Sequence, residues 1–160
     1  MKNLLLIIAT LLFVFGTNSI RAQNWNSEEL EIIKRVEIGW SSWQEAVNQK
    51  DLSIWLNAVN LTDDWKCWWT EDGALWDVAD TKRNFELFSK DVKKYYWMNV
   101  NPLSVEVHGD VAFIWFYALF TIEDINGKTT TTEDKRFEVY RKIDGKWRWS
   151  AGMVKSKETD

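Results

Sequence analysis

The stretch "FEVYRKIDGKWRW", Phe137–Trp149, decides how the second half of the chain folds. Its residues alternate between two faces on either side of the pair Asp144-Gly145. An Asp-Gly link between two alternating runs is one of the strongest short-range signals for a β-hairpin. The sequence therefore predicts a strand over Thr129–Ile143 and a second strand over Lys146–Val154.

The region before this hairpin continues the same pattern. Leu103, Val105 and Val107 alternate, and "HGD" is a turn signal. Val111–Ile122 follows as a long apolar strand, which ends at the turn signal "ING". Four consecutive strands joined by short turns predict an antiparallel meander.

The first half of the chain shows helical spacing instead. Apolar residues between 28 and 48 recur at steps of three and four, as in an amphipathic helix: Ile32, Val36, Trp40, Trp43 and Val47. Ser27 is a suitable start for this helix. Asp51 begins a second, shorter helix, and Asp80 or Thr81 is predicted to cap a third. Three helices followed by a meander predict an α+β fold, with the helices packed on one face of the sheet.

Tryptophan is concentrated between the helices. The stretch "DDWKCWWTEDGALW", Asp63–Trp76, has four tryptophans, and the whole chain has 12. Alternation places Trp65, Cys67 and Trp69 on one face of a short strand and Trp68 on the other. Such rings pack a core, line a pocket for a flat ligand, or form an exposed stacking surface, and the sequence leaves these alternatives open.

The N-terminus has the pattern of a secretory signal peptide. Met1-Lys2-Asn3 is basic, Leu4–Ile20 carries no charge, and the small residue Ala22 provides a cleavage site. Residues 1–22 are therefore predicted to be removed, leaving residues 23–160 as a single exported domain, periplasmic or secreted. A retained membrane anchor is the alternative. The strongly apolar run is short for that role, because a spanning helix needs about 20 residues.

Charge and cysteine content limit the partners and the source of stability. The formal charge is −4, and removal of Lys2 and Arg21 makes it −6. An acidic domain is a poor partner for nucleic acid or for an anionic membrane surface. Cys67 is the single cysteine, so no intrachain disulfide can form. Stability is therefore expected to come from burial of apolar surface.

The strand Val111–Ile122 is apolar on both faces. In a sheet with one face exposed to solvent, apolar and polar residues alternate along each strand. The second face of this strand is therefore also expected to be covered. We expect a homodimer through the outer face of the sheet. A sharply curled sheet that covers itself is the alternative.

Several motifs resemble the nuclear transport factor 2-like superfamily, and most closely its SnoaL-like branch, which includes small exported bacterial proteins. The motifs are "WQEAVNQKD" (Trp43–Asp51), "DDW" (Asp63–Trp65), "GDVAFIWF" (Gly109–Phe116) and "FEVYRKIDGKWRW" (Phe137–Trp149). The resemblance implies a cone-like roll, in which a strongly curved sheet surrounds the long N-terminal helix and leaves an internal cavity. It also implies frequent dimerisation through the outer sheet face.

The residue types present exclude several kinds of site. His108 is the single histidine and lies at a turn, so a serine or cysteine nucleophile lacks a credible base. Clustered histidines and cysteines, which zinc needs, are missing from the sequence, as is a glycine-rich phosphate loop. We therefore predict no cofactor and no metal, and either simple binding or a cofactor-free reaction.

The catalytic candidates lie on the third strand of the meander. Strand alternation puts Arg136, Glu138 and Tyr140 on one face. In kinase association domain relatives, the position that matches Glu138 holds an arginine that faces the cavity, so the resemblance implies that Glu138 is inside. A carboxylate in an apolar cavity has a raised pKa, which suits a general base or acid. Arg136 is the alternative partner that would hold it ionised. A solvated face or an ion pair across the dimer is the other interpretation.

The resemblance also places Phe116 and Ala118 on the cavity side of their strand, with Trp115 and Tyr117 outward. The expected ligand-binding residues are thus Trp43, Trp69, Phe116, Ala118 and Tyr140. Three aspartates are weaker candidates, either as caps and turns or as acids at the cavity mouth: Asp63, Asp64 and Asp77. The chain departs from many relatives by having Met153 in place of a histidine and Phe137 in place of a threonine.

Three functions remain at this point. The first is an exported domain that binds a small, mostly apolar or aromatic molecule in its cavity. The second is a cofactor-free lyase, isomerase or hydrolase with Glu138 as general base. The third and weakest is carbohydrate binding on exposed tryptophan rings.

Overall fold

The structure, a computed structural model, describes residues 24–71 and 73–159 of the 160-residue chain. The predicted signal peptide lies outside the described residues. This part contains three helices, α2 (Ser27–Gln49), α3 (Leu52–Val59) and α4 (Val78–Asp91). It also contains six strands: β1 (Leu61–Trp69), β2 (Ala74–Trp76), β3 (Val92–His108), β4 (Val111–Asp124), β5 (Thr129–Ile143) and β6 (Lys146–Thr159).

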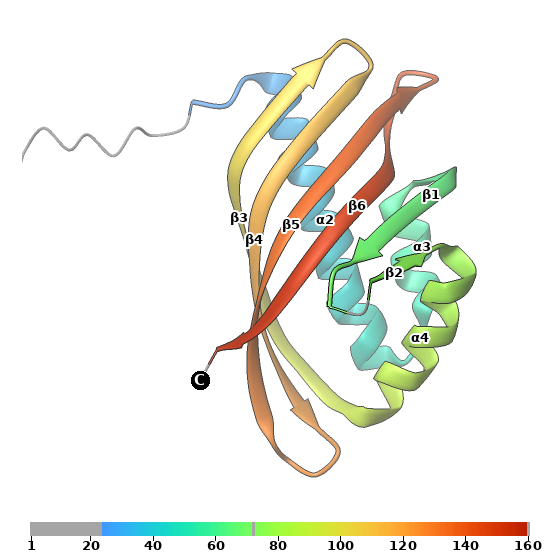
Figure 1. Ribbon diagram of the computed structural model, residues 1–160, viewed down its shortest axis with the longest axis vertical. Helices are drawn as coiled ribbons and strands as arrows, with labels where there is room; N and C mark the ends of the chain where they lie inside the picture. The colour runs from blue at the N-terminus through green and yellow to red at the C-terminus, as the bar shows by residue number, and fades with distance from the viewer. Residues whose placement is uncertain (1–23, 72, 160) are drawn as a thin grey trace, which may run out of the picture.

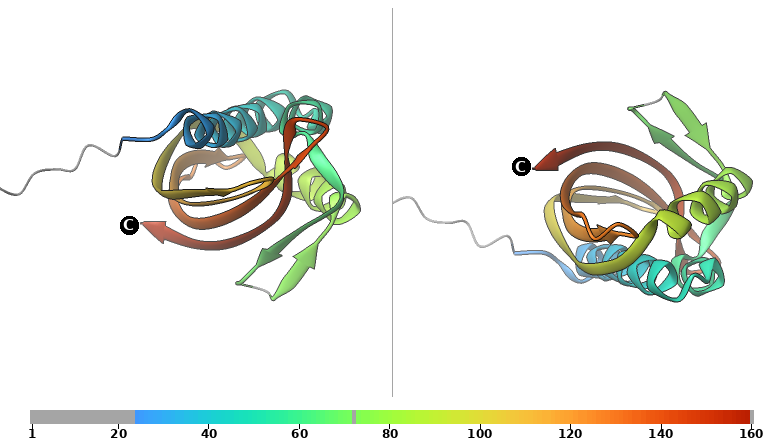
Figure 2. Two further views of the ribbon diagram at one scale, coloured as in Figure 1. Left: turned by 90° about the horizontal axis from the view of Figure 1, so that it is seen from above. Right: turned by 90° about the horizontal axis from the view of Figure 1, so that it is seen from below.

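All strands form one sheet in the order β2-β1-β6-β5-β4-β3. The four long strands curl, and α2 lies along the concave side of the curl (Figures 1 and 2). The pairs β3–β4, β4–β5 and β5–β6 are antiparallel, as the meander predicted. The predicted α+β fold, with three helices on a strongly curved sheet, is confirmed.

The helix starts are set by side-chain caps. Asn26, one residue before the predicted start, caps α2. Its side chain accepts from the backbone N–H groups of Glu28 and Glu29, and the Glu29 carboxylate accepts from the backbone N–H of Asn26. Asp77 caps α4 in the same reciprocal way with Asp80. The prediction that Asp80 or Thr81 caps α4 is therefore wrong by three or four positions. Asp80 is the third helical residue, and its side chain completes the capping box.

Two features of the sheet were not predicted. β3 begins at Val92, directly after α4, and passes through Pro102, where the register with β4 shifts. Proline is tolerated there because β3 is an edge strand. On the side of β3 that faces no other strand, no inter-strand hydrogen bond needs the missing N–H. β1 pairs in parallel with β6, and the short β2 pairs with the end of β1. These two strands extend the sheet past the meander.

The outer face of the sheet carries a row of large apolar side chains. Trp115 lies opposite Phe137, Phe137 opposite Met153, and Met153 opposite Trp68, across β4, β5, β6 and β1. The rings of Trp115 and Phe137 are 4.8 Å apart between centroids, and Phe113 stacks on Phe137 at 6.0 Å. We call these five residues the outer patch. Trp115 is 37% exposed, whereas the next residue, Phe116, is buried on the inner face.

Candidate functional site

A cavity of about 310 Å³, partly open to solvent, lies between the three helices and the concave face of the sheet. Eleven of its twenty lining residues are aromatic, and they include seven tryptophans. We call the lining residues the cavity wall: Trp40, Trp43, Trp55, Trp65, Cys67, Trp69, Trp76, Thr81, Asn84, Phe85, Phe88, Tyr95, Met98, Phe120, Ile122, Thr132, Asp134, Arg136, Trp149 and Ser156.

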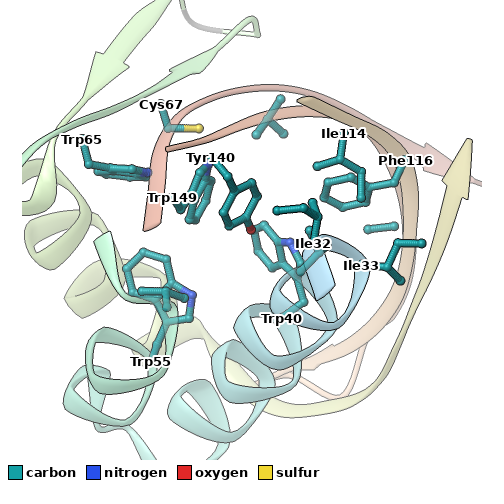
Figure 3. Packing of buried hydrophobic residues seen from close by; sticks show 14 of the residues in the cluster. Ile32, Ile33, Trp40, Trp55, Trp65, Cys67, Ile114, Phe116, Tyr140 and Trp149 are labelled. Carbon is teal, nitrogen blue, oxygen red and sulfur yellow. The ribbon is translucent and has the colours of Figure 1, made fainter. Parts of the chain in front are cut away.

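The aromatic rings of the wall hold one another in place. Trp43 packs edge-on against Trp55 and Phe85, with centroid distances of 5.4 Å in both pairs. Trp65 and Trp149 meet at 5.2 Å, and Figure 3 shows these two rings converging near Trp55. Edge-to-face pairs at such distances add to the stability gained from burial, so this end of the cavity has a fixed shape.

The polar part of the wall is an ion pair on β5. Arg136 donates from Nε to Asp134 Oδ2 at 3.0 Å, and its Nη2 donates to the same oxygen. The guanidinium carbon lies 3.7 Å from the ring centroid of Trp40 and 5.6 Å from that of Trp69. Both charged residues are buried, with 6% exposure for Arg136 and 1% for Asp134. Within the described chain, Asp134 Oδ1 has no hydrogen-bond partner.

Glu138 is buried two residues further along β5 and is 2% exposed. Its Oε2 accepts a hydrogen bond from the Tyr140 hydroxyl at 2.9 Å, and its Oε1 has no hydrogen-bond partner among the described residues. Burial raises the pKa of Glu138 to about 7, and the charge of Arg136, the bond from Tyr140 and the neighbouring Trp40 side chain offset part of that rise. A carboxyl with this pKa exchanges its proton near neutral pH.

Two titratable groups of the wall, Cys67 and Tyr95, stay protonated at neutral pH. Burial raises the pKa of the Cys67 thiol to about 12. Burial also raises the pKa of Tyr95 well above its usual range. Neither group is therefore suited to act as a nucleophile or base at neutral pH.

The structure separates the five expected ligand-binding residues into two groups. Trp43 and Trp69 belong to the cavity wall. Phe116, Ala118 and Tyr140 are buried on the inner side, where the family resemblance placed Phe116 and Ala118, but they are not part of the wall. Figure 3 shows the reason for Phe116: it lies with Ile114 near Ile32 and Ile33, at the end of the core where α2 fills the curl of the sheet.

The two catalytic candidates are also separated. Arg136 lies in the cavity wall, whereas Glu138 is buried outside it. The alternative in which Arg136 pairs with Glu138 is not what the structure shows: Arg136 donates to Asp134, and Tyr140 donates to Glu138. The interpretation of a solvated face is excluded by the burial of all four side chains.

The weaker acidic candidates lie at the surface. Asp64 is exposed and forms an ion pair with Arg141. Asp63 is exposed as well. Asp77 caps α4 and forms an ion pair with Lys66 at 3.2 Å. His108 is exposed, 3.4 Å from Glu106. None of these four residues belongs to the cavity wall.

Sequence reasoning missed the polar wall residues around Arg136. Asp134 and Thr132 have the same parity on β5 as Arg136, so alternation alone would have placed them inside. Ser156 lies opposite Asp134 on β6, beyond the predicted end of that strand. Tyr95 lies near the start of β3, where the sequence shows no alternation, so no pattern pointed to it.

The described part of the chain has no group of three or more His, Cys, Asp or Glu residues arranged to hold a metal ion. In residues 24–71 and 73–159, no helix has both the length and the apolar character needed to cross a membrane.

Structural comparison identifies several solved relatives, all of them at low sequence identity. The association domain of C. elegans CaMKII is 19% identical and has a TM-score of 0.55, with coverage of 81% of this chain and 98% of that one. The hexachlorocyclohexane dehydrochlorinase LinA-type3 of Novosphingobium barchaimii LL02 is 14% identical with a TM-score of 0.62, covering 81% and 90%. An NTF2-like protein of Cytophaga hutchinsonii ATCC 33406 is 15% identical with a TM-score of 0.60, covering 83% and 100%. At these identities the likeness shows the fold alone.

Sequence comparison gives the family. No curated protein is significantly similar to the chain. The family model for the calcium/calmodulin dependent protein kinase II association domain matches residues 28–151, which is more than half of the chain. The chain therefore has the nuclear transport factor 2-like fold and belongs to the calcium/calmodulin dependent protein kinase II association domain family.

Proposed function

We propose that this protein is an exported binding protein that holds a small, flat, mostly apolar molecule in its cavity. The observation that carries the proposal is the composition of the cavity wall, in which eleven of twenty residues are aromatic. Binding sites for small molecules are concave, largely apolar and furnished with a few polar groups that orient the ligand. The Asp134–Arg136 pair is suited to that orienting role.

The size of the cavity agrees with a ligand of one or two fused rings. Small-molecule sites have volumes from about 300 Å³ upward, and this cavity has about 310 Å³. The rings around Trp43 are fixed by edge-on contacts with Trp55 and Phe85. A ligand therefore meets a preformed wall and does not need to order it, which favours affinity.

A cofactor-free lyase, isomerase or hydrolase is the second candidate. It is favoured by the pKa of about 7 for Glu138, which suits a general base at neutral pH. The position of Glu138 argues against it, since the carboxyl is buried outside the cavity wall and its Oε2 is engaged by Tyr140. A substrate in the cavity would have to displace wall residues before it reached this base.

Carbohydrate binding on exposed rings is the weakest candidate. Trp68 and Trp97 are the most exposed tryptophans of the described chain. They lie on β1 and β3, which are separated by three other strands of the sheet. Two rings at that separation do not form one stacking surface for a short sugar.

We further propose that the protein forms a homodimer through the outer patch. The family is named for an association domain, and a similar solved structure is described as the CaMKII hub of S. rosetta. The outer patch supplies the physical reason, because Trp115, Phe137 and Met153 form a continuous apolar row across three strands. Such a row on an exposed sheet face is typical of a protein–protein interface.

The experiment that tests the binding proposal is calorimetric titration with 2-methoxynaphthalene, a flat, neutral and apolar probe. We expect saturable binding at one site per chain. Trp69→Leu removes a ring from the wall and should weaken binding by about tenfold or more. Trp97→Leu is the matched control, since Trp97 is exposed on β3 and is not part of the wall. Absence of saturable binding, or equal losses in both variants, would contradict the proposal.

A further inference from the structure

We propose that the cavity selects neutral ligands that carry a hydrogen-bond donor and discriminates against carboxylates and other anions. This inference rests on the proposed binding function and concerns the same cavity. It follows from the charges and the unpaired polar atoms of the wall.

The single cationic side chain of the wall is already neutralised. Arg136 and Asp134 are the two charged residues among the twenty that line the cavity. Nε and Nη2 of Arg136 both donate to Asp134 Oδ2, and Trp40 lies against the guanidinium at 3.7 Å. An anion that entered the cavity would therefore find no uncompensated positive charge. It would have to leave water without a full counter-charge, which is strongly unfavourable.

A second carboxyl adds to this effect. Glu138 is buried on the same face of β5 as Arg136, two residues away. Counting these three residues, the polar side of the site has one positive group and two acidic groups. Any ionisation of Glu138 makes its net charge negative. An anionic ligand is disfavoured in that state even more strongly.

The wall also has an unused hydrogen-bond acceptor. Among the described residues, no donor reaches the buried Oδ1 of Asp134. A buried acceptor without a partner lowers stability, and a ligand O–H or N–H that reaches it recovers that loss. Elsewhere in the wall, Nε1 of Trp55 and Nε1 of Trp65 lack an acceptor in the described chain. These neutral N–H groups suit a ligand oxygen but carry no charge that would compensate an anion.

The test compares three probes that share one ring system, with each probe titrated into the wild-type protein at neutral pH. 2-Naphthol is neutral and donates a hydrogen bond, 2-methoxynaphthalene is neutral without a donor, and 2-naphthoate is an anion. We expect 2-naphthol to bind about tenfold tighter than 2-methoxynaphthalene, and 2-naphthoate to bind at least about tenfold more weakly than either. A 2-naphthoate affinity equal to or above that of the neutral probes would overturn the inference.

The variant Asp134→Asn gives a second, independent readout, because it keeps the shape and removes the charge that neutralises Arg136. We expect the affinity for 2-naphthoate to rise about tenfold or more. The affinity for 2-naphthol should fall to that for 2-methoxynaphthalene, which should itself be unchanged. Glu133→Gln is the matched control, since Glu133 is the neighbouring acid on β5 with the opposite parity. An unchanged order of affinities in Asp134→Asn would count against the inference.

The two proposals fail in different ways. If 2-methoxynaphthalene binds but the charged and neutral probes have equal affinities, the proposed selectivity is wrong and the proposed binding function stands. If none of the three probes binds, the binding function is wrong and the selectivity falls with it. The comparison in the wild-type protein needs no variant, so it is decisive even if Asp134→Asn does not fold.

Discussion

The hydroxyl of Tyr140 donates a hydrogen bond to Glu138 Oε2 at 2.9 Å, and both side chains are buried. This bond leaves Oε1 of Glu138 without a partner in the described part of the chain. A buried carboxylate with one oxygen unsatisfied is poorly stabilised in its ionised form. The pair therefore couples the stability of the fold to the proton concentration.

Glu138→Gln should remove this coupling. The pKa of Glu138 is raised from 4.5 to about 7 in the folded protein, so the folded state holds its proton more tightly than the unfolded state does. The free energy of unfolding of the wild type should thus fall as pH rises from 4.5 to about 7, by roughly 3 kcal/mol from this group, and level off above that range. The variant should be more stable than the wild type at pH 8, by about 1–3 kcal/mol.

The measurement is urea unfolding of both proteins at several values of pH across this window. Glu86→Gln is a suitable control, because Glu86 is exposed on α4. It should leave the pH dependence of the wild type unchanged. A Glu138→Gln variant that is less stable than the wild type at pH 8 would show that the carboxylate is well paired.

Arg136→Met should be strongly destabilising. The substitution leaves Asp134 buried without its cation, which typically costs about 3–5 kcal/mol. The double variant Asp134→Asn/Arg136→Met removes both charges and should be less destabilised than the sum of the single variants. A double-mutant cycle from urea unfolding measures this coupling.

The surface pair Glu31–Arg35 provides the comparison for that cycle. Its closest atoms are 3.7 Å apart and both side chains are partly exposed. Exposed pairs couple by about 0–1 kcal/mol. Coupling of the buried pair that is no larger than this value would mean that water reaches Asp134.

Trp115→Glu should disrupt the proposed dimer. The substitution puts a charge into the outer patch, at the position opposite Phe137. We expect a dimer for the wild type and a monomer for the variant in sedimentation at micromolar concentration. Leu87→Glu is a suitable control, since Leu87 is exposed on α4, away from the sheet. A monomeric wild type would contradict the proposed dimer.

Cys67 should be unreactive in the folded protein. Its thiol is buried and its pKa is raised to about 12, while the reactive species is the thiolate. Ellman's reagent at pH 8 should therefore label the native protein slowly and the guanidinium-unfolded protein completely. Binding of a cavity ligand should slow labelling further, because Cys67 belongs to the wall. Rapid stoichiometric labelling of the native protein would contradict the burial of this residue.

The export prediction has a direct test. Mass spectrometry of the protein purified from its native source should find a chain that begins at or near Gln23. A full-length chain that retains Met1 in a membrane fraction would instead support the anchor.

The alternation and helical spacing of apolar residues predicted the fold, because each pattern depends only on a short segment of the chain. The three- and four-residue steps of α2 and the Asp-Gly turn before β6 need no distant partner to be recognised. The start of β3 is different. Residues 93–101 lie on an edge strand with bulged register, so their burial does not alternate cleanly, and the sequence shows no period there. The parallel pairing of β1 with β6 is likewise a contact between distant parts of the chain, which local patterns do not report.

From the sequence, the site residues on β5 could be assigned only to one face of the strand. Parity placed Arg136, Glu138 and Tyr140 on one face, the resemblance implied that Glu138 is inside, and all three are buried. It did not show where the cavity ends along β5, which depends on how far α2 fills the curl of the sheet. The partner choice of Arg136 also escaped prediction, because Asp134 and Glu138 are both two residues away on the same face.

The place of β6 in the sheet has a consequence for the order of events during synthesis. β6 is the last strand of the described chain, yet it lies between β1 and β5. Until its residues leave the ribosome, β1 cannot join the meander, and the cavity lacks Trp149 and Ser156. Contacts that join distant segments form late, because closing the loop between them costs entropy first. The sheet is therefore completed only after β6 has been synthesised, a delay that agrees with the proposed export, since a chain that crosses a membrane unfolded must not complete its sheet first.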